Sequence, residues 1–479
     1  MGHRCRPAVA PIAVTLSCLV VARGIVAEQA AASMKTSRSD VVDHLHWLAS
    51  LAPTRLTGTP AERNVQIAIG ERMTALGYQI DWQPFRFSRH IYGSLALHFG
   101  LALVFAAVGL RAPWLGALGH GIVAISFVSE AAFRRHALRA FWPKVETQNL
   151  IVTSPASSGI TKRRIVFSSH VDSAYTGFMF RPAVIRMIGA PPPWFLPFLR
   201  KQLMLPLASV IALVALEITR SFYGFTAWPA TLVLCVPSLI VFVLNLDVVL
   251  RNEVVPGAAD NLSGCAAQLV IAEEWAKMVS PDTEVVFAFT GAEEAGTGGA
   301  AHLSRHMSSQ WDRAITSVVV LDTLSNGKLF MLEEGELVRR KIPSDLAEAV
   351  RNAAAELRVP SPPPYIIPAG ATDALPFLVE GYRALALTCI DETQHTPLNY
   401  HHPHDTADRV DPVQLRESTR LATEVLRRLA GATSRADISV TGAGSDLNPR
   451  KIRVGSISDA PFPAADQVPP KPREKSTTA

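Results

Sequence analysis

The stretch RRIVFSSHVDS, residues 163–173, decides how this chain folds. It begins with the short apolar run Ile165 to Phe167, which is typical of a buried strand. Two side chains that can bind metal, His170 and Asp172, follow directly. In open α/β sheets, sites form in the loops at the carboxyl ends of the strands. This segment therefore predicts both a strand and one edge of a functional site.

The same arrangement recurs along the chain. TEVVFAFT (283–290) runs into Glu293 and Glu294, ITSVVVL (315–321) runs into Asp322, and RALALTCI (383–390) precedes His401. One further acid, Asp260, lies in PGAADNLSG (256–264), just before a predicted helix. We therefore expect these side chains to meet at one edge of a sheet.

Helical segments alternate with these strands. The clearest are LSGCAAQLVIAEEWAKM (262–278), SDLAEAVRNAAAEL (344–357) and PVQLRESTRLATEVLRRL (412–429). Further strands are predicted over 78–87 and 146–154, and amphipathic helices over 41–51 and 61–77. This order predicts an α/β fold with a mixed, largely parallel central sheet flanked by helices.

The composition points to a chain that is not purely soluble. Of 479 residues only 18% are charged, below the ~25% of ordinary soluble domains. The net charge of +5 is too small to indicate nucleic-acid binding. Five cysteines in a chain of this length exclude a disulfide framework.

Four long apolar runs interrupt the α/β pattern, at 93–110, 114–133, 203–218 and 226–246. Each approaches the ~20 residues that a helix needs to cross a bilayer. The alternative is buried core helices, but runs with so little charge are rare in soluble cores. We expect two inserted apolar helical hairpins, within inserts 92–133 and 178–250, and contact with a lipid bilayer.

The two ends of the chain differ from its body. Residues 1–27 combine a short basic start with an apolar stretch and small residues, which predicts a signal peptide or signal anchor. An ordinary apolar leader is the alternative. Residues 433–479 are rich in Ser, Pro, Gly and Ala, which predicts a disordered tail.

The metal-capable residues comprise two histidines, two aspartates and a Glu-Glu pair, with Asp172 beside them. Imidazole and carboxylate ligands together suit zinc. Five ligands exceed the three that a catalytic zinc takes from protein, but suit two zincs if one carboxylate bridges them. In the pair, one glutamate can bind metal while its neighbour takes a proton from water. In His-x-Asp, the aspartate can accept a hydrogen bond from the imidazole nitrogen that does not bind metal.

Taken together, the segments HVDS, AADNLSG, GAEEAGTGGA, VVLD and YHHPHDTAD resemble the di-zinc aminopeptidase family of bacterial leucyl aminopeptidases and aminopeptidase Y. The segments RLTGTP and ETQNLIVTSP resemble the same family, so the similarity covers about 40–90 and 146–431 without the inserts. The resemblance implies a zinc-exopeptidase (phosphorylase/hydrolase-like) fold and aminopeptidase activity with two zinc ions per chain.

The resemblance also implies a role for each site residue. Asp260 would bridge the two zincs, and Glu293 would be the general base. The remaining implied roles are zinc ligation at one position by His170 and Asp322, zinc ligation at the other by Glu294 and His401, and orientation of His170 by Asp172. A cis peptide between Asp260 and Asn261 is implied as well.

The chain departs from the family pattern in two respects. GATDALPFL resembles the family's SDHxPF segment, with Asp373 at its acidic position, but Ala374 replaces the histidine, which affects expected substrate contacts. The second apolar pair lies between Asp172 and Asp260, where the family has only a short loop.

Three functions remain open from the sequence: an aminopeptidase acting on peptides, a glutaminyl-cyclase-like transferase with a single zinc, and a non-catalytic membrane receptor or scaffold. Retention of all the ligands favours an enzyme. The oligomeric state is left open, and no nucleic-acid partner is expected.

The sequence gives conflicting evidence about the side of the membrane. The signal-like start places the catalytic body outside the cytoplasm. Basic residues flank the apolar pairs on the catalytic side, which by the positive-inside rule favours the cytoplasm. These residues are Arg134, Arg135, Arg139, Arg181, Arg186, Arg200, Lys201 and Arg251. Because the first segment often dominates orientation, we predict an extracytoplasmic catalytic domain, with the cytoplasmic face as the alternative.

Overall fold

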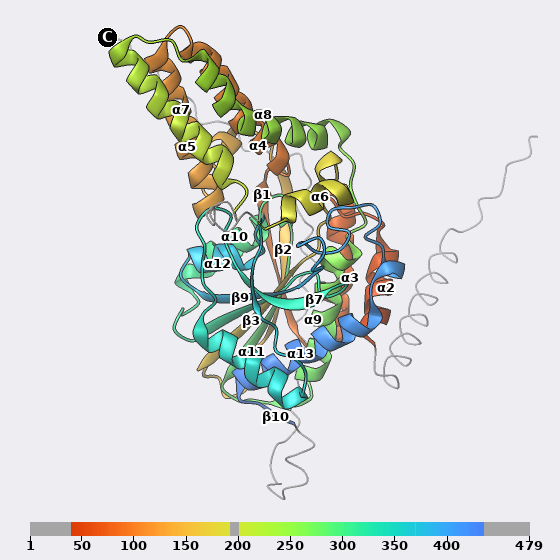
Figure 1. The fold of residues 1–479 in the computed structure, drawn as a ribbon. Helices are drawn as coiled ribbons and strands as arrows, with labels where there is room; N and C mark the ends of the chain where they lie inside the picture. The colour runs from red at the N-terminus through yellow and green to blue at the C-terminus, as the bar shows by residue number, and fades with distance from the viewer. Residues whose placement is uncertain (1–39, 192–200, 369, 435–479) are drawn as a thin grey trace, which may run out of the picture. The chain divides into compact units, whose positions relative to one another are not determined.

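In the computed structural model, which describes residues 40–191, 201–368 and 370–434, eight strands form one central sheet in the order β1-β2-β5-β3-β6-β9-β7-β8 (Figure 1). The strands are β1 (Gln79–Phe87), β2 (Val145–Ser154), β3 (Arg163–His170), β5 (Thr283–Thr290), β6 (Thr316–Leu321), β7 (Lys328–Glu333), β8 (Pro364–Ile366) and β9 (Arg383–Ile390). The central strands β5, β3, β6 and β9 are parallel neighbours. β1–β2, β2–β5 and β7–β9 are antiparallel. The predicted mixed sheet is confirmed, although β7 and β8 were not predicted.

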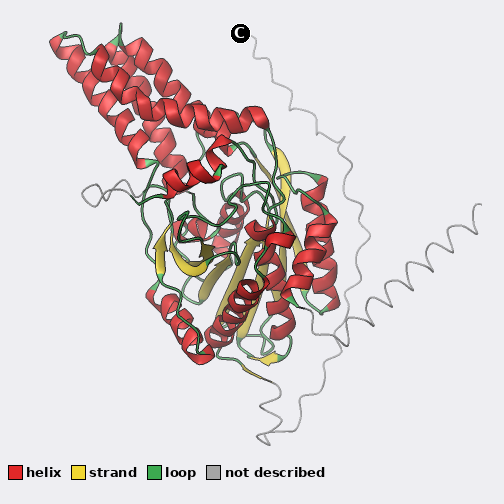
Figure 2. Ribbon diagram, turned by 45° about the vertical axis from the view of Figure 1, so that its right-hand side comes forward, coloured by secondary structure: helices red, strands yellow, loops and turns green. Residues whose placement is uncertain are grey.

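Helices cover both faces of this sheet (Figure 2). One face is packed by α2 (Val41–Leu51), α3 (Pro60–Ala75), α9 (Ser263–Trp275), α11 (Ser344–Leu357) and α13 (Pro412–Ala430). The other is packed by α10 (Gly298–His306) and α12 (Ala374–Val379). The α/β class expected from alternating strands and helices is therefore confirmed.

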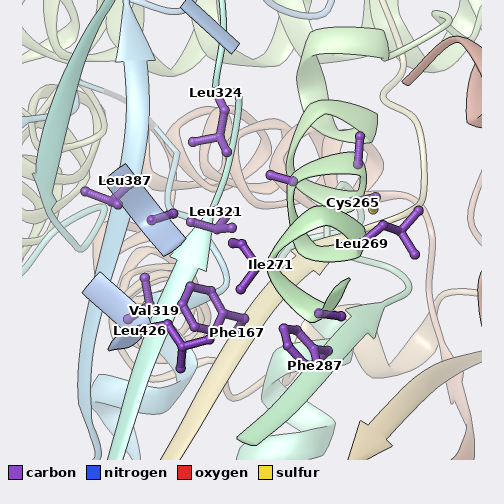
Figure 3. Packing of buried hydrophobic residues seen from close by; sticks show 14 of the residues in the cluster. Phe167, Cys265, Leu269, Ile271, Phe287, Val319, Leu321, Leu324, Leu387 and Leu426 are labelled. Atoms are coloured by element: carbon purple, nitrogen blue, oxygen red, sulfur yellow. The ribbon is translucent and has the colours of Figure 1, made fainter. Parts of the chain in front are cut away.

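Side chains of the central strands alternate between two apolar cores. On β3, Phe167 packs into the core beneath α9, and its neighbour Val166 packs into the core beneath α10 and α12. Figure 3 shows Phe167, Phe287 and Val319 side by side from three adjacent strands, with Leu269 of α9 nearby. Because both faces are buried, the strands read as apolar runs, and this allowed their prediction from sequence.

The two predicted hairpins are present as four long helices that form a bundle (Figure 1). They are α4 (Ile91–Gly109), α5 (Pro113–Phe133), α7 (Met204–Tyr223) and α8 (Trp228–Arg251). Each is long and apolar enough to cross a membrane. The first pair connects β1 to β2, and the second lies between β3 and α9. The second pair extends beyond its predicted bounds because the polar residues at its ends remain helical.

Several polar side chains of the bundle are buried in its interior and bond to one another. The fully buried Glu217 of α7 lies 2.8 Å from His120 Nδ1 of α5, and Ser94 of α4 donates to Glu130 of α5 at 2.9 Å. The outward positions are large apolar side chains; on α8, Val233 is 70% exposed. A polar interior with an apolar exterior is the arrangement expected of helices surrounded by lipid.

Short elements complete the described part of the chain. They are α6 (Pro182–Gly189), the turns η1 (Leu138–Phe141), η2 (Phe178–Phe180), η5 (Met307–Ser309) and η6 (Ala407–Arg409), the π turn η4 (Ala258–Leu262), and the two-stranded sheet of β4 (Met278–Val279) and β10 (Thr433–Ser434). The β4–β10 pair corrects the start of the predicted tail at 433–479, because Thr433 and Ser434 form β10 and pair with β4 in antiparallel fashion. The predicted signal at 1–27 and the rest of the tail lie outside the described residues.

Candidate metal centre

The five predicted metal ligands come together at the carboxyl edge of the central strands. His170 ends β3, Asp322 follows β6, and Glu294 lies in the turn after β5. Asp260 lies in η4, before α9, and His401 lies in the loop before η6. The five residues form two ligand triplets, His170–Asp260–Asp322 and Asp260–Glu294–His401, and the donor atoms within each lie within 4.8 Å of one another. A third group of the same kind, His170–Glu293–Glu294, includes the predicted general base.

Asp260 belongs to both triplets. Its Oδ1 lies 3.1 Å from His170 Nε2, and its Oδ2 lies 3.6 Å from His401 Nε2. The other members close each group: His401 Nε2 is 3.0 Å from Glu294 Oε2, and His170 Nε2 is 4.0 Å from Asp322 Oδ1. Asp260 thus directs one carboxylate oxygen toward the histidine of each triplet.

The chemistry of these donors fits a metal cation. A cavity of about 40 Å³ is lined by Asp260, Glu294, Asp322 and His401. Burial, with the nearby Asp260 carboxylate, raises the pKa of Asp322 to about 7 and holds that of Glu294 well above its usual range. Glu294 Oε1 is buried without a hydrogen-bond partner among the described residues. Crowded buried carboxylates need a positive charge, and mixed imidazole and carboxylate donors suit zinc.

The backbone around Asp260 is fixed from two sides. Asp405 accepts hydrogen bonds from the backbone N–H groups of Ala259, at 2.7 Å, and Asp260, at 3.0 Å. The Asn261 amide donates to the Leu321 carbonyl at 2.9 Å. The Asp260–Asn261 peptide is cis, as the family resemblance implied. Asp405 was not assigned a role from the sequence, although it lies in the quoted segment YHHPHDTAD.

Asp172 contacts His170 differently from our expectation. The imidazole Nδ1 lies 3.1 Å from the backbone carbonyl of Asp172 and 3.7 Å from its carboxylate. The carboxylate instead accepts from the backbone N–H groups of Glu293, at 3.0 Å, and Glu294, at 3.1 Å, and from the Thr57 hydroxyl at 2.8 Å. The two carboxylate oxygens of Asp172 therefore hold the Glu-Glu turn in position, because they accept hydrogen bonds from both of its backbone N–H groups.

Arg55, from the quoted RLTGTP segment, ties two site loops together. Its buried guanidinium donates to the carbonyls of Val171, at 2.7 Å, Pro256, at 2.8 Å, and Gly257, at 2.8 Å. The loop after β3 and the loop leading to Asp260 are thereby held at a fixed separation. These three hydrogen bonds are the structural role of the arginine in the RLTGTP segment.

Residues of both inserts surround His401. The Tyr92 hydroxyl, near the start of α4, lies 3.0 Å from His401 Nδ1. The ring of Phe180 lies 4.7 Å from the His401 ring, and that of Tyr400 lies 3.9 Å from it. His401 has a positive φ of 50°, a conformation that packed neighbours must hold in place. Sequence reasoning missed Tyr92 because it directly precedes an apolar run and carries no motif.

Glu293 lies beside the five predicted ligands, and its carboxylate makes no hydrogen bond to any of them. Its Oε2 is 3.8 Å from His170 Nε2, and it lines the same cavity as Asp260, Glu294, Asp322 and His401. Burial holds the pKa of Glu293 well above its usual range, partly offset by His170. Ala292, with φ of 56°, turns the chain so that Glu293 and Glu294 both reach the site. A buried carboxylate with a raised pKa beside metal ligands suits a general base.

Other polar residues singled out from the sequence lie away from the centre. Asp373 is buried and accepts hydrogen bonds from the hydroxyls of Ser168, at 3.1 Å, and Thr290, at 2.5 Å. None of the ligand groups found among the described residues includes the four histidines that we expected to be bystanders, which are His302, His306, His402 and His404.

Comparisons with known proteins found solved structures of similar fold and one matching family model. No curated protein matches the sequence. Similar folds occur in a zinc aminopeptidase from Bacillus subtilis (15% identity, TM-score 0.49, covering 82% of this chain and 95% of that one) and in an aminopeptidase from Aneurinibacillus sp. strain AM-1 (16%, 0.48, 83% and 95%). A glutaminyl cyclase from Fimbriiglobus ruber is also similar (13%, 0.47, 82% and 95%).

The sequence itself matches a family model. Residues 239–426 match the model of peptidase family M28, and this range contains Asp260, Glu293, Glu294, Asp322 and His401. The remaining ligand, His170, joins them in space from β3, outside the matched range. The chain is therefore similar to peptidase family M28 over residues 239–426.

Proposed function

We propose that the protein is a membrane-bound di-zinc aminopeptidase, which hydrolyses the N-terminal peptide bond of peptides. The observation that carries the proposal is the position of Asp260, with one carboxylate oxygen toward His170 and the other toward His401. A carboxylate shared between two ligand sets is the arrangement that paired-metal hydrolases need.

The residues around this carboxylate define a hydrolytic mechanism. Two zinc ions held by the triplets would polarise the scissile carbonyl and make water a stronger nucleophile. Glu293 takes the proton of the attacking water and passes it to the leaving amine. Asp172 keeps Glu293 and Glu294 in place through their backbone N–H groups. Burial of Glu293 raises its affinity for the proton, which this transfer requires.

A glutaminyl-cyclase-like reaction with a single zinc is the second candidate, and metal content distinguishes it. The full chain, purified in detergent, should hold about two zinc ions and release the N-terminal residue from unblocked dipeptides but not from N-acetylated ones. The Glu293→Gln variant is the control for contaminating peptidases. A fully active preparation with one zinc per chain, or cyclisation of N-terminal glutamine without peptide hydrolysis, would contradict the proposal.

The bundle supports attachment to a bilayer. Large apolar side chains cover its outer surface on every helix, including Val104, Ile125, Ile211 and Val233, which are 54–71% exposed. Exposed apolar surface of this extent marks a membrane or partner contact. The interior ion pairs and hydrogen bonds of the bundle favour lipid as its surroundings.

We further propose that the catalytic domain lies outside the cytoplasm. Three of the basic residues that argued for the cytoplasmic side are buried in structural contacts: Arg134, Arg139 and Lys201. Exposed basic residues remain at Arg135, Arg181, Arg186 and Arg251, whereas Arg200 lies outside the described residues. A protease-protection assay on intact spheroplasts tests this proposal. Digestion of the catalytic domain by added protease is expected, and full protection would place it in the cytoplasm.

A further inference from the structure

A cavity of about 360 Å³ continues from the candidate metal centre into the foot of the helix bundle. Its wall at the metal centre includes Glu293, Glu294 and His401. The bundle side is formed by apolar residues of all four long helices, among them Leu95, Phe127, Pro206 and Leu244. The general base and one ligand pair therefore share a single space with the apolar helices.

The bundle side of this cavity suits an apolar group. Two charged residues that line it, Glu130 and Arg134, have partners: Glu130 lies 3.3 Å from Arg139, and Arg134 lies 3.0 Å from Glu336. Burying a charged or polar group without a partner is costly, whereas an apolar group gains by leaving water. The volume is within the ~300–1,000 Å³ of small-molecule pockets.

Part of the cavity wall is exposed where α7 and α8 lie next to each other. Leu205 of α7 and Ile240 of α8 both line the cavity, yet they are 46% and 53% exposed. Their exposed neighbours on α8 are Leu239 and Val243, at 48% and 52%. The mouth therefore opens on apolar surface, which a bilayer would cover if the helices span it.

We infer that the enzyme acts on amides that carry a long apolar chain next to the scissile bond, and that this chain enters from the bilayer between α7 and α8 and rests in the cavity. The inference rests on the proposed function, since it names the substrate class of the same site. The chain can belong to the N-terminal side chain or to the leaving amine, and two series of substrates distinguish these possibilities.

The first experiment measures kcat/KM of the full chain, purified in detergent. One series has N-terminal residues with methyl, butyl and octyl side chains, and the other has alanyl amides of methylamine, butylamine and octylamine. In at least one series kcat/KM should rise steeply, up to about fourfold per methylene if the chain is fully buried. Equal values in both series would overturn the inference and leave the proposed function intact, whereas no hydrolysis of any substrate would refute the proposed function.

A pair of variants locates the path of the chain. Ile240→Trp should narrow the mouth and lower the ratio of octyl to methyl kcat/KM by at least ~10-fold, because several methylenes lose their burial. Leu239→Trp is the matched control, since it adds the same bulk to the next, similarly exposed residue, which does not line the cavity. Partition of each substrate into micelles is the same for every variant, so it cancels when the octyl-to-methyl ratios of the variants are compared. An equal ratio in both variants would overturn the α7–α8 entrance.

A binding experiment tests the cavity without requiring hydrolysis. A decylamine probe with a diazirine on its chain should cross-link to Leu95, Phe127 or Leu244 in the metal-stripped full chain. Labelling should fall in Ile240→Trp and persist in Leu239→Trp. Cross-links confined to outward residues such as Val233 would show only adsorption to the apolar surface and would overturn the inference.

Discussion

Tyr92→Phe should weaken metal binding at one of the two positions. The change removes only the hydroxyl that lies 3.0 Å from His401 Nδ1. His401 Nε2 faces Glu294 Oε2 at 3.0 Å, so Nε2 is the nitrogen placed for metal. Nδ1 then carries the proton and donates a hydrogen bond to the Tyr92 hydroxyl oxygen, which fixes the tautomer and the orientation of the ring. Without that acceptor, His401 becomes a poorer ligand.

The magnitude follows from the position of the bond. Loss of a hydrogen-bond partner that holds a metal-ligating histidine typically lowers metal affinity ~10–100-fold, which corresponds to about 1.4–2.7 kcal/mol. Because Asp260 and the His170–Asp322 pair are unchanged, the second position should keep its affinity. The Tyr92 ring remains, and so does its edge contact with Phe180, at 6.0 Å between centroids. The fold should therefore be preserved.

The assay is competition titration of zinc against a chromophoric chelator, with thermal unfolding measured in parallel. Tyr175→Phe is the matched control, because Tyr175 is buried next to Tyr92 and its hydroxyl has no hydrogen-bond partner among the described residues. It should bind two zinc ions as the wild type does. Equal zinc affinities in Tyr92→Phe and Tyr175→Phe, at both positions, would refute the assigned role of Tyr92.

Three further outcomes follow from the same geometry. Glu293→Gln should retain zinc and lower kcat by at least ~100-fold in single-turnover assays, since the general base is lost; near-normal kcat would exclude Glu293 from that role. Asp260→Asn should lose both zinc ions in metal analysis, because one residue serves both triplets, and a variant that keeps two would disprove the bridge. Arg55→Lys should lower the free energy of unfolding by at least ~1–3 kcal/mol in denaturant titration, because buried carbonyls lose their donors; an unchanged stability would show that the loop tie is dispensable.

The strands and the ligand set were predictable because each follows a local rule. Central strands buried on both faces appear as apolar runs, and parallel strands bring the residues that follow them to one edge. His170, Glu294 and Asp322 could therefore be placed together from sequence alone. Their assignment to separate metal positions came instead from the family resemblance. It depends on strand order and loop geometry, which no single segment of the sequence determines.

Contacts between distant segments were not predictable in the same way. The Asp172 carboxylate was expected to bond the imidazole two residues away, but it bonds the turn that carries Glu293, more than a hundred residues later in the chain. Tyr92 reaches His401 only because α4 begins beside the site. Such contacts depend on how loops close in three dimensions, and neither periodicity nor residue type specifies that.

The apolar inserts are part of the catalytic centre as well as candidates for membrane attachment. Arg139, just after α5, lies 3.3 Å from Glu130 of α5, donates to the Ser88 carbonyl at 2.7 Å, and also donates to the carbonyl of Ala295, the residue after Glu294. The turn that supplies a metal ligand is thus joined to the bundle through one buried guanidinium. A chain shortened by its hairpins would lose this link, the partner of His401 and the walls of the apolar cavity together. The bundle must therefore be folded for the site to be complete.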